Sequence, residues 1–182
     1  MRRLRRGIPS FTLIELLVVV SIIGLLAGLA VPAVGGAMYA ARKTKASAMA
    51  HQIRTALTQF NTEYGYFPTN GISGGIGQTG PALTLILVGS SSATNDNPRQ
   101  IAFLEVPADF TLGNSGSVSN QGIVTPRGLY PKNAQTNFSV AVDHDYNGQV
   151  TVKDGSADKT IQATTAVWFT DGKDANKTVG TW

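Results

Sequence analysis

The chain has 182 residues with no cysteine, 15 Lys and Arg against 11 Asp and Glu, and a sequence pI near 9.5. Four of the basic residues are arginines within the first six positions, and once these are set aside 11 basic residues face 11 acidic ones. Overall charge therefore gives no support to nucleic-acid binding, and the lack of cysteine excludes a disulfide and a thiolate metal site.

The chain opens with a basic run and then a long apolar stretch. Residues 11–30 contain one charged residue, Glu15, and otherwise match the roughly 20 apolar residues that a helix needs to cross a bilayer. The preceding arginines favour the cytoplasmic side. We therefore expect a single-pass protein whose C-terminal domain lies outside the cytoplasm.

Two ordinary interpretations of this stretch have to be weighed. A secretory signal peptide cleaved after Ala30 has suitably small residues at Gly28 and Ala30, but its apolar core would normally be about 7–15 residues long. A plain membrane anchor has to accommodate Glu15, whose burial in the bilayer core costs about 2–3 kcal/mol. A glutamate at headgroup depth would be tolerated, so the plain anchor stays open.

The segment Ser10-Phe11-Thr12-Leu13-Ile14-Glu15 resembles the cleavage and methylation motif of type IV prepilins and type II secretion pseudopilins. The resemblance implies that a prepilin peptidase removes a basic leader, residues 1–10, between Ser10 and Phe11, and that Phe11 is then N-methylated. It also implies a role in assembly for Glu15 and for two helix-weakening residues, Gly24 and Pro32. Ser10 departs from the glycine that usually precedes the cut.

The pattern predicts that the assembly helix, residues 11–34, continues as an amphipathic helix over residues 35–64. Apolar residues recur there at intervals of three and four, which defines one helix face: Met49, Ile53, Leu57, Phe60 and Tyr64. An unbroken helix over residues 11–64 would be about 80 Å long. Pro32 and the pair Gly35-Gly36 are its expected weak points, and Gly65 is its expected C-terminal cap.

Residues 65–182 read as a loop-rich domain with antiparallel strands. Two glycine motifs in residues 70–80 lack the strand and helix that their chemistry needs, so we expect a surface loop. Pro81 opens a short helix over residues 81–88. Alternating or β-branched residues predict strands at 138–142, 150–152 and 161–169, joined as a meander on the apolar helix face. The expected fold is α+β and pilin-like, and no nucleophile–base pair suggests an enzyme.

One acidic turn combines residues that could bind calcium. Oxygen-bearing residues alternate along it and a glycine follows, and calcium prefers six to eight oxygen ligands. The candidate ligands are Asp143, Asp145, Asn147, Gln149 and Asp154. The resemblance adds weight, because major pseudopilins bind calcium in their β region, although the Asp-Pro-Trp-Gly segment usual there is missing. The loop at residues 171–176 could lend a further ligand. The alternative is a type I′ hairpin turn at Asn147-Gly148 with no ion.

The resemblance implies a structural subunit of a helical filament that is stored in the bacterial inner membrane before assembly. The acidic turn and the lack of cysteine favour a type II secretion pseudopilus, with a type IV pilin or minor pilin as the alternative. A single-span, membrane-anchored ligand-binding domain is the second alternative. The implied partners are copies of the chain, other pilins or pseudopilins, the prepilin peptidase, the inner-membrane assembly platform and the membrane. No nucleic acid is expected among them.

Overall fold

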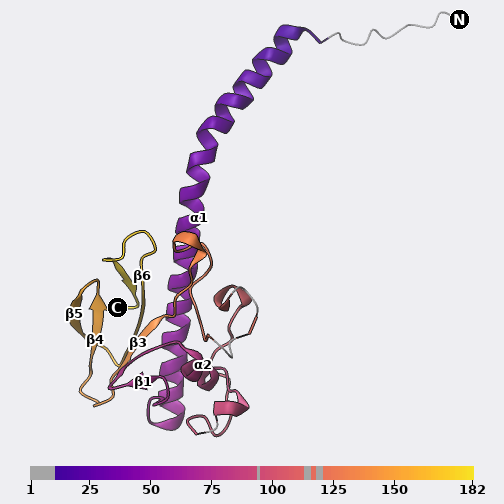
Figure 1. The fold of residues 1–182 in the computed structure, drawn as a ribbon. Helices are drawn as coiled ribbons and strands as arrows, with labels where there is room; N and C mark the ends of the chain where they lie inside the picture. The colour runs from indigo at the N-terminus through magenta and orange to yellow at the C-terminus, as the bar shows by residue number, and fades with distance from the viewer. Residues whose placement is uncertain (1–10, 94, 113–115, 118–120) are drawn as a thin grey trace, which may run out of the picture. The chain divides into compact units, whose positions relative to one another are not determined.

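The computed structural model describes residues 11–93, 95–112, 116–117 and 121–182, apart from the side chains of Pro32 and Ala93 (Figure 1). The chain divides into two compact units, Met1–Met38 and Tyr39–Trp182. The helices are α1 (Leu13–Tyr64), α2 (Pro81–Leu87) and the 3-10 helices η1 (Ser91–Ala93), η2 (Ala108–Phe110) and η4 (Pro131–Asn133). The strands are β1 (Ile72–Ser73), β2 (Ile76–Gln78), β3 (Ser139–Val142), β4 (Gln149–Asp154), β5 (Ala157–Gln162), β6 (Thr165–Thr170) and β7 (Thr178–Gly180).

Helix α1 runs for 52 residues without a break, as the sequence predicts. Its backbone stays helical through Pro32, Gly35 and Gly36, so none of these expected weak points ends the helix. The helix stops where Gly65 adopts a positive φ of 77° and donates its N–H to the carbonyl of Asn61 at 2.8 Å. Glycine takes this left-handed conformation without the steric cost that a Cβ would bring.

The predicted apolar face of α1 lies in the core of the Tyr39–Trp182 unit. Met49, Ile53, Leu57 and Phe60 are each at most 1% exposed, and only Tyr64 at the helix end is partly open to solvent. The same core takes in the inward-facing side chains of β3 and β6 together with α2. Full burial of each large apolar side chain contributes about 1.5–3 kcal/mol, so this face fixes the sheet against the helix.

The main sheet has the order β1-β2-β3-β6-β7 and is antiparallel throughout. The predicted meander is therefore wrong: β3 pairs with β2 and β6, whereas β4 and β5 pair only with each other in a separate hairpin (Figure 1). The predicted strand at 161–169 is split between the end of β5 and β6.

Burial on both faces of the sheet explains this topology. Val140 and Val167 face the α1 core, while Ala141, Ala166 and Trp168 face a second apolar cluster. The β4–β5 hairpin supplies Val150 and Val152 to that second cluster. A hairpin that covers the outer face removes more apolar surface from water than one added at an edge, so the strands do not follow chain order.

The glycine-rich segment at residues 70–80 forms the β1–β2 hairpin, which corrects the predicted surface loop. A Cβ on Gly77 would lie 2.1 Å from the carbonyl oxygen of Gly71, so this close approach requires glycine. The glycines therefore serve the hairpin and its pairing with β3. Neither glycine motif has the strand–turn–helix setting of a nucleotide or hydrolase site.

A buried amide holds the end of α1 to α2. The Tyr64 hydroxyl donates to Oδ1 of Asn97 at 2.6 Å, and Nδ2 of Asn97 donates to the carbonyls of Ile86 and Ile101 at 2.8 Å each. Asn97 is fully buried, and its side chain satisfies backbone groups that would otherwise be buried without partners. Helix α2 itself begins at Pro81, as predicted.

Candidate functional site

The predicted assembly residue Glu15 forms a capping box at the start of α1. Its Oε2 accepts the backbone N–H of Thr12 at 2.8 Å and the Thr12 hydroxyl at 2.7 Å, while its own N–H donates to Oγ1 of Thr12 at 3.2 Å. This role was not among those predicted for Glu15, although Thr12-x-x-Glu15 is the pattern that signals a capping box. The glutamate is thus held in one position, close to the predicted new amino terminus at Phe11.

The first part of α1 exposes nearly all of its apolar side chains. The large apolar residues from Phe11 to Met38 are exposed, and α1 is the one helix among the described residues long and apolar enough to cross a membrane. The Ser21 hydroxyl is internally satisfied, because it donates to the carbonyl of Val18 at 2.8 Å. A Cβ on Gly24 would meet no atom within 4 Å, so packing within one chain gives no reason for glycine there.

Two of the predicted site residues fall outside what the structure describes. Ser10 precedes the described residues, and for Pro32 the backbone alone is described. Cleavage before Phe11, its N-methylation, and the assembly roles of Glu15, Gly24 and Pro32 accordingly stay predictions.

The acidic turn between β3 and β4 is held by its own hydrogen bonds. Both carboxylate oxygens of Asp143 accept backbone N–H groups, from Asn147 at 3.0 Å and Gly148 at 2.8 Å. The Asn147 amide donates to Asp145 at 2.7 Å and accepts the N–H of Gln149 at 2.8 Å. The four residues Asp143, Asp145, Asn147 and Gln149 are thus brought together, but as a capped turn.

The fifth predicted ligand does not join this turn. Asp154 ends β4 and Gln149 begins it, so a strand length of about 16 Å separates them. Within the described part of the chain, no group of three or more His, Asp or Glu side chains is placed to hold a metal ion. Calcium, which prefers six to eight oxygen ligands, would have to find the others in amide, backbone and water oxygens, and its binding at this turn stays a prediction. The alternative type I′ turn at Asn147-Gly148 is wrong, since positive φ occurs at Tyr146 and Gly148 rather than at Asn147.

The loop at residues 171–176, a suggested source of a further ligand, instead forms a partly buried ion pair with α1. Asp171 is 7% exposed, and its Oδ2 lies 2.5 Å from Nζ of Lys43. Its Oδ1 accepts a hydrogen bond from the Tyr39 hydroxyl. Lys173 sits over the Tyr39 ring, 4.2 Å from its centre. These contacts tie the β6–β7 loop to α1, and no local sequence pattern signals them.

The contacts of this ion pair shift the pKa values of both Asp171 and Tyr39. Burial opposes ionisation of Asp171, but hydrogen bonds from Lys43 and Tyr39 outweigh it and hold the pKa of the carboxyl well below its usual range. Burial and the hydrogen bond to Asp171 together raise the pKa of Tyr39 to about 12. The carboxylate and the neutral phenol are therefore the forms present at neutral pH.

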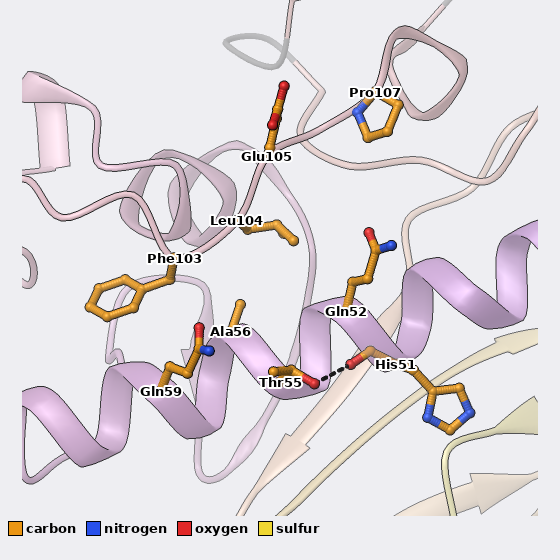
Figure 2. Close-up of a pocket in the computed structure, with 9 residues that line it drawn as sticks. All are labelled: His51, Gln52, Thr55, Ala56, Gln59, Phe103, Leu104, Glu105 and Pro107. Atoms are coloured by element: carbon orange, nitrogen blue, oxygen red, sulfur yellow. Dashed lines mark hydrogen bonds between the residues drawn. The ribbon is translucent and has the colours of Figure 1, made fainter.

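A surface groove of about 690 Å³ lies between α1 and the segment at residues 103–107 (Figure 2). Figure 2 shows that the His51 ring and the Glu105 carboxylate point in opposite directions, and Thr55 donates its hydroxyl to the His51 carbonyl at 3.0 Å. The groove therefore has no paired acid and base within reach of one another. His51 is an exposed residue of α1.

Comparison with known proteins gives matches to pilins. The model for the prokaryotic N-terminal methylation motif matches residues 9–31. A fimbrial protein from Neisseria meningitidis serogroup A is 36% identical over 76 residues, which are 42% of this chain and 43% of that protein. A type IV major pilin from Neisseria gonorrhoeae is likewise 36% identical over 76 residues, or 42% and 44% of the two chains. No solved structure matches.

The motif match and the α+β architecture agree on one class: this is a prepilin-like chain with a pilin-like fold. It spans less than half the length of the curated relatives that it matches. The resemblance stated from Ser10 to Glu15 is thereby confirmed at the level of the motif.

Proposed function

We propose that the chain is a structural subunit of a pilus-type filament. It is first inserted in the membrane as a prepilin and is then cleaved before Phe11, N-methylated, and moved into the filament. Copies stacked head to tail make heterologous contacts, which produce open helical assemblies. The observation that carries the proposal is the exposed apolar segment from Phe11 to Met38, whose only charged side chain is Glu15.

The two environments of this segment explain the proposal physically. In a bilayer, the apolar side chains face lipid and Glu15 lies near one end, where headgroups and water tolerate a charge. Within a bundle of copies, the carboxylate needs a partner because an unpaired buried charge is costly. The methylated amine of Phe11 on a neighbouring copy is the natural partner, and it sets the axial register.

The type IV pilus is the first candidate filament, since the relatives that align are named as a fimbrial protein and a type IV major pilin. The pseudopilus of type II secretion is the second candidate, favoured by the lack of cysteine and by the acidic turn at residues 143–149. In either case the further partners would be other pilins or pseudopilins, the prepilin peptidase and the assembly platform of the bacterial inner membrane.

The test compares two substitutions that both damage the capping box. Glu15→Ala removes the box and the proposed intersubunit partner, whereas Thr12→Ala weakens the box and leaves the carboxylate. Loss of such a cap costs about 0.5–2 kcal/mol of local helix stability in either variant. We expect Glu15→Ala to insert in the membrane and to abolish filaments, and Thr12→Ala to retain them.

Filament yield in the host, measured by shearing and immunoblotting, separates the two roles of Glu15. Equal yields from the two variants would reduce Glu15 to a helix cap and refute its role between subunits. A full-length, unprocessed chain that never polymerises would instead support the other class of function, a membrane-anchored ligand-binding domain.

A further inference from the structure

Charge is distributed unevenly over the Tyr39–Trp182 unit. Seven basic residues lie on the start of this unit's part of α1 and on two loops beside it; we call them the basic collar: Arg42, Lys43, Lys45, Arg127, Lys132, Lys173 and Lys177. Three acidic residues accompany them, namely Asp109, Asp171 and Asp174. The β4–β5 hairpin, whose turn approaches the same loops at Gly155, adds two charges of each sign. The collar region therefore carries a net charge of +4.

Contacts from three separate segments bring the collar together. Arg42 donates to the carbonyl of Gly128 at 3.1 Å, which fixes the loop at residues 127–133 against α1. Lys43 and Tyr39 hold Asp171 and with it the β6–β7 loop. Figure 1 shows both loops, orange and yellow, beside this stretch of α1. The remainder of the unit has two basic and five acidic residues, a net charge of −3.

Four collar residues are available to a partner. Arg127, Lys132, Lys173 and Lys177 are exposed, and none of them makes an ion pair within the described residues. Their like charges repel one another across loops held close by the contacts above. An anionic partner would relieve that repulsion, and neutral protein surface would not.

The position of the collar along the chain indicates what that partner is. After Glu15 the next charged residue is Arg42, 27 residues further along one helix. At the rise of an α-helix this corresponds to about 40 Å, close to the thickness of a bilayer with its headgroup layers. With Glu15 at one headgroup layer, the uncharged stretch that follows is thus long enough to cross the bilayer before Arg42, the first collar residue along the chain.

We propose that the basic collar binds the anionic phospholipid headgroups of the leaflet on the domain's side while the subunit is stored in the membrane. The proposal rests on the membrane stage of the proposed function. Each Lys or Arg near an anionic membrane surface strengthens binding about fivefold. The collar then holds the domain against the bilayer until the subunit leaves for the filament.

The test uses the full chain, one copy per nanodisc, with a fluorophore on Ala134→Cys. The chain has no cysteine of its own, so this label is unique, and Ala134 is exposed beside Lys132. A headgroup-quencher lipid at fixed fraction reports approach of the loop to the membrane. We expect quenching to rise when 30 mol% phosphatidylglycerol replaces phosphatidylcholine, and to fall again in 500 mM salt, where screening is strong.

Lys132→Gln and Lys177→Gln should each lower the ratio of docked to undocked domain about fivefold. Arg99→Gln, which removes a charge from the acidic remainder of the unit, is the control and should leave the ratio unchanged. Quenching that ignores anionic lipid in a chain that inserts normally overturns the headgroup proposal and leaves the filament function standing. Quenching that rises only with two copies per disc would assign the collar to a second copy instead. A chain that fails to insert would overturn the membrane stage and the collar proposal together.

Discussion

Asp171→Asn perturbs the ion pair that ties the β6–β7 loop to α1. The native carboxylate is 7% exposed and receives hydrogen bonds from Tyr39, from Lys43 and from the backbone N–H of Lys173 at 3.0 Å. Asparagine keeps the shape and one acceptor oxygen but removes the charge. The substitution therefore leaves the Lys43 ammonium beside a neutral partner.

The size of the effect follows from how much water each partner keeps. Removing one member of a buried ion pair costs about 3–5 kcal/mol. The Lys43 side chain is 30% exposed and can still be hydrated, and the asparagine still accepts a hydrogen bond. We therefore expect a loss of about 2–3 kcal/mol in the free energy of unfolding, or about 6–12 °C in the melting temperature.

Urea unfolding of the full chain in detergent micelles, followed by the fluorescence of Trp168 and Trp182, measures this loss. Asp158→Asn is the matched control, because Asp158 pairs with Lys153 at 2.9 Å and both side chains are about two-thirds exposed. Such an exposed pair contributes at most about 1 kcal/mol. Equal losses for Asp171→Asn and Asp158→Asn would refute the claim that the ion pair of Asp171 and Lys43 stabilises the fold more than an exposed ion pair does.

Three further predictions concern the same unit. Phe138→Ala should lower the free energy of unfolding in urea by about 3–5 kcal/mol, because Phe138 is fully buried between Phe110 and Phe169. A loss below 1 kcal/mol would contradict the placement of Phe138 in the core. Because folding lowers the pKa of Asp171, the ion pair's contribution to stability is complete above about pH 4 and is lost as the pH falls further. The free energy of unfolding of the native protein, measured from pH 6 to pH 2, should therefore fall more steeply than that of Asp171→Asn. Calcium at 1 mM should leave the melting temperature within 1 °C, since the acidic turn is satisfied by its own hydrogen bonds; a larger rise that Asp145→Asn abolishes would establish the calcium site.

Local patterns in the sequence predicted the helical half of the fold. The three- and four-residue spacing from Met49 to Tyr64 identified the buried face of α1, and Gly65 identified its end. Pro81 likewise marked the start of α2. These features depend on neighbouring residues, so periodicity and capping rules were sufficient to find them.

Contacts between segments that are far apart in the sequence could not be predicted from such local patterns. The sequence shows that Val150 and Val152 alternate, but it does not show that they cover the outer face of a sheet instead of extending it. The ion pair of Lys43 and Asp171 joins residues 128 positions apart, and no local sequence pattern at either residue predicts it. The capping box of Thr12 and Glu15, by contrast, has a local signal, because Thr-x-x-Glu ahead of an apolar run is the spacing of such a box.

Processing as a prepilin underlies both the filament proposal and the membrane stage, and the intact mass of the protein isolated from its native host measures it. We expect a chain that begins at Phe11 and carries one added methyl group on its amine. A chain that begins at Met1 would contradict it in favour of a plain anchor. A chain that begins at Val31 would contradict it in favour of a secretory signal peptide.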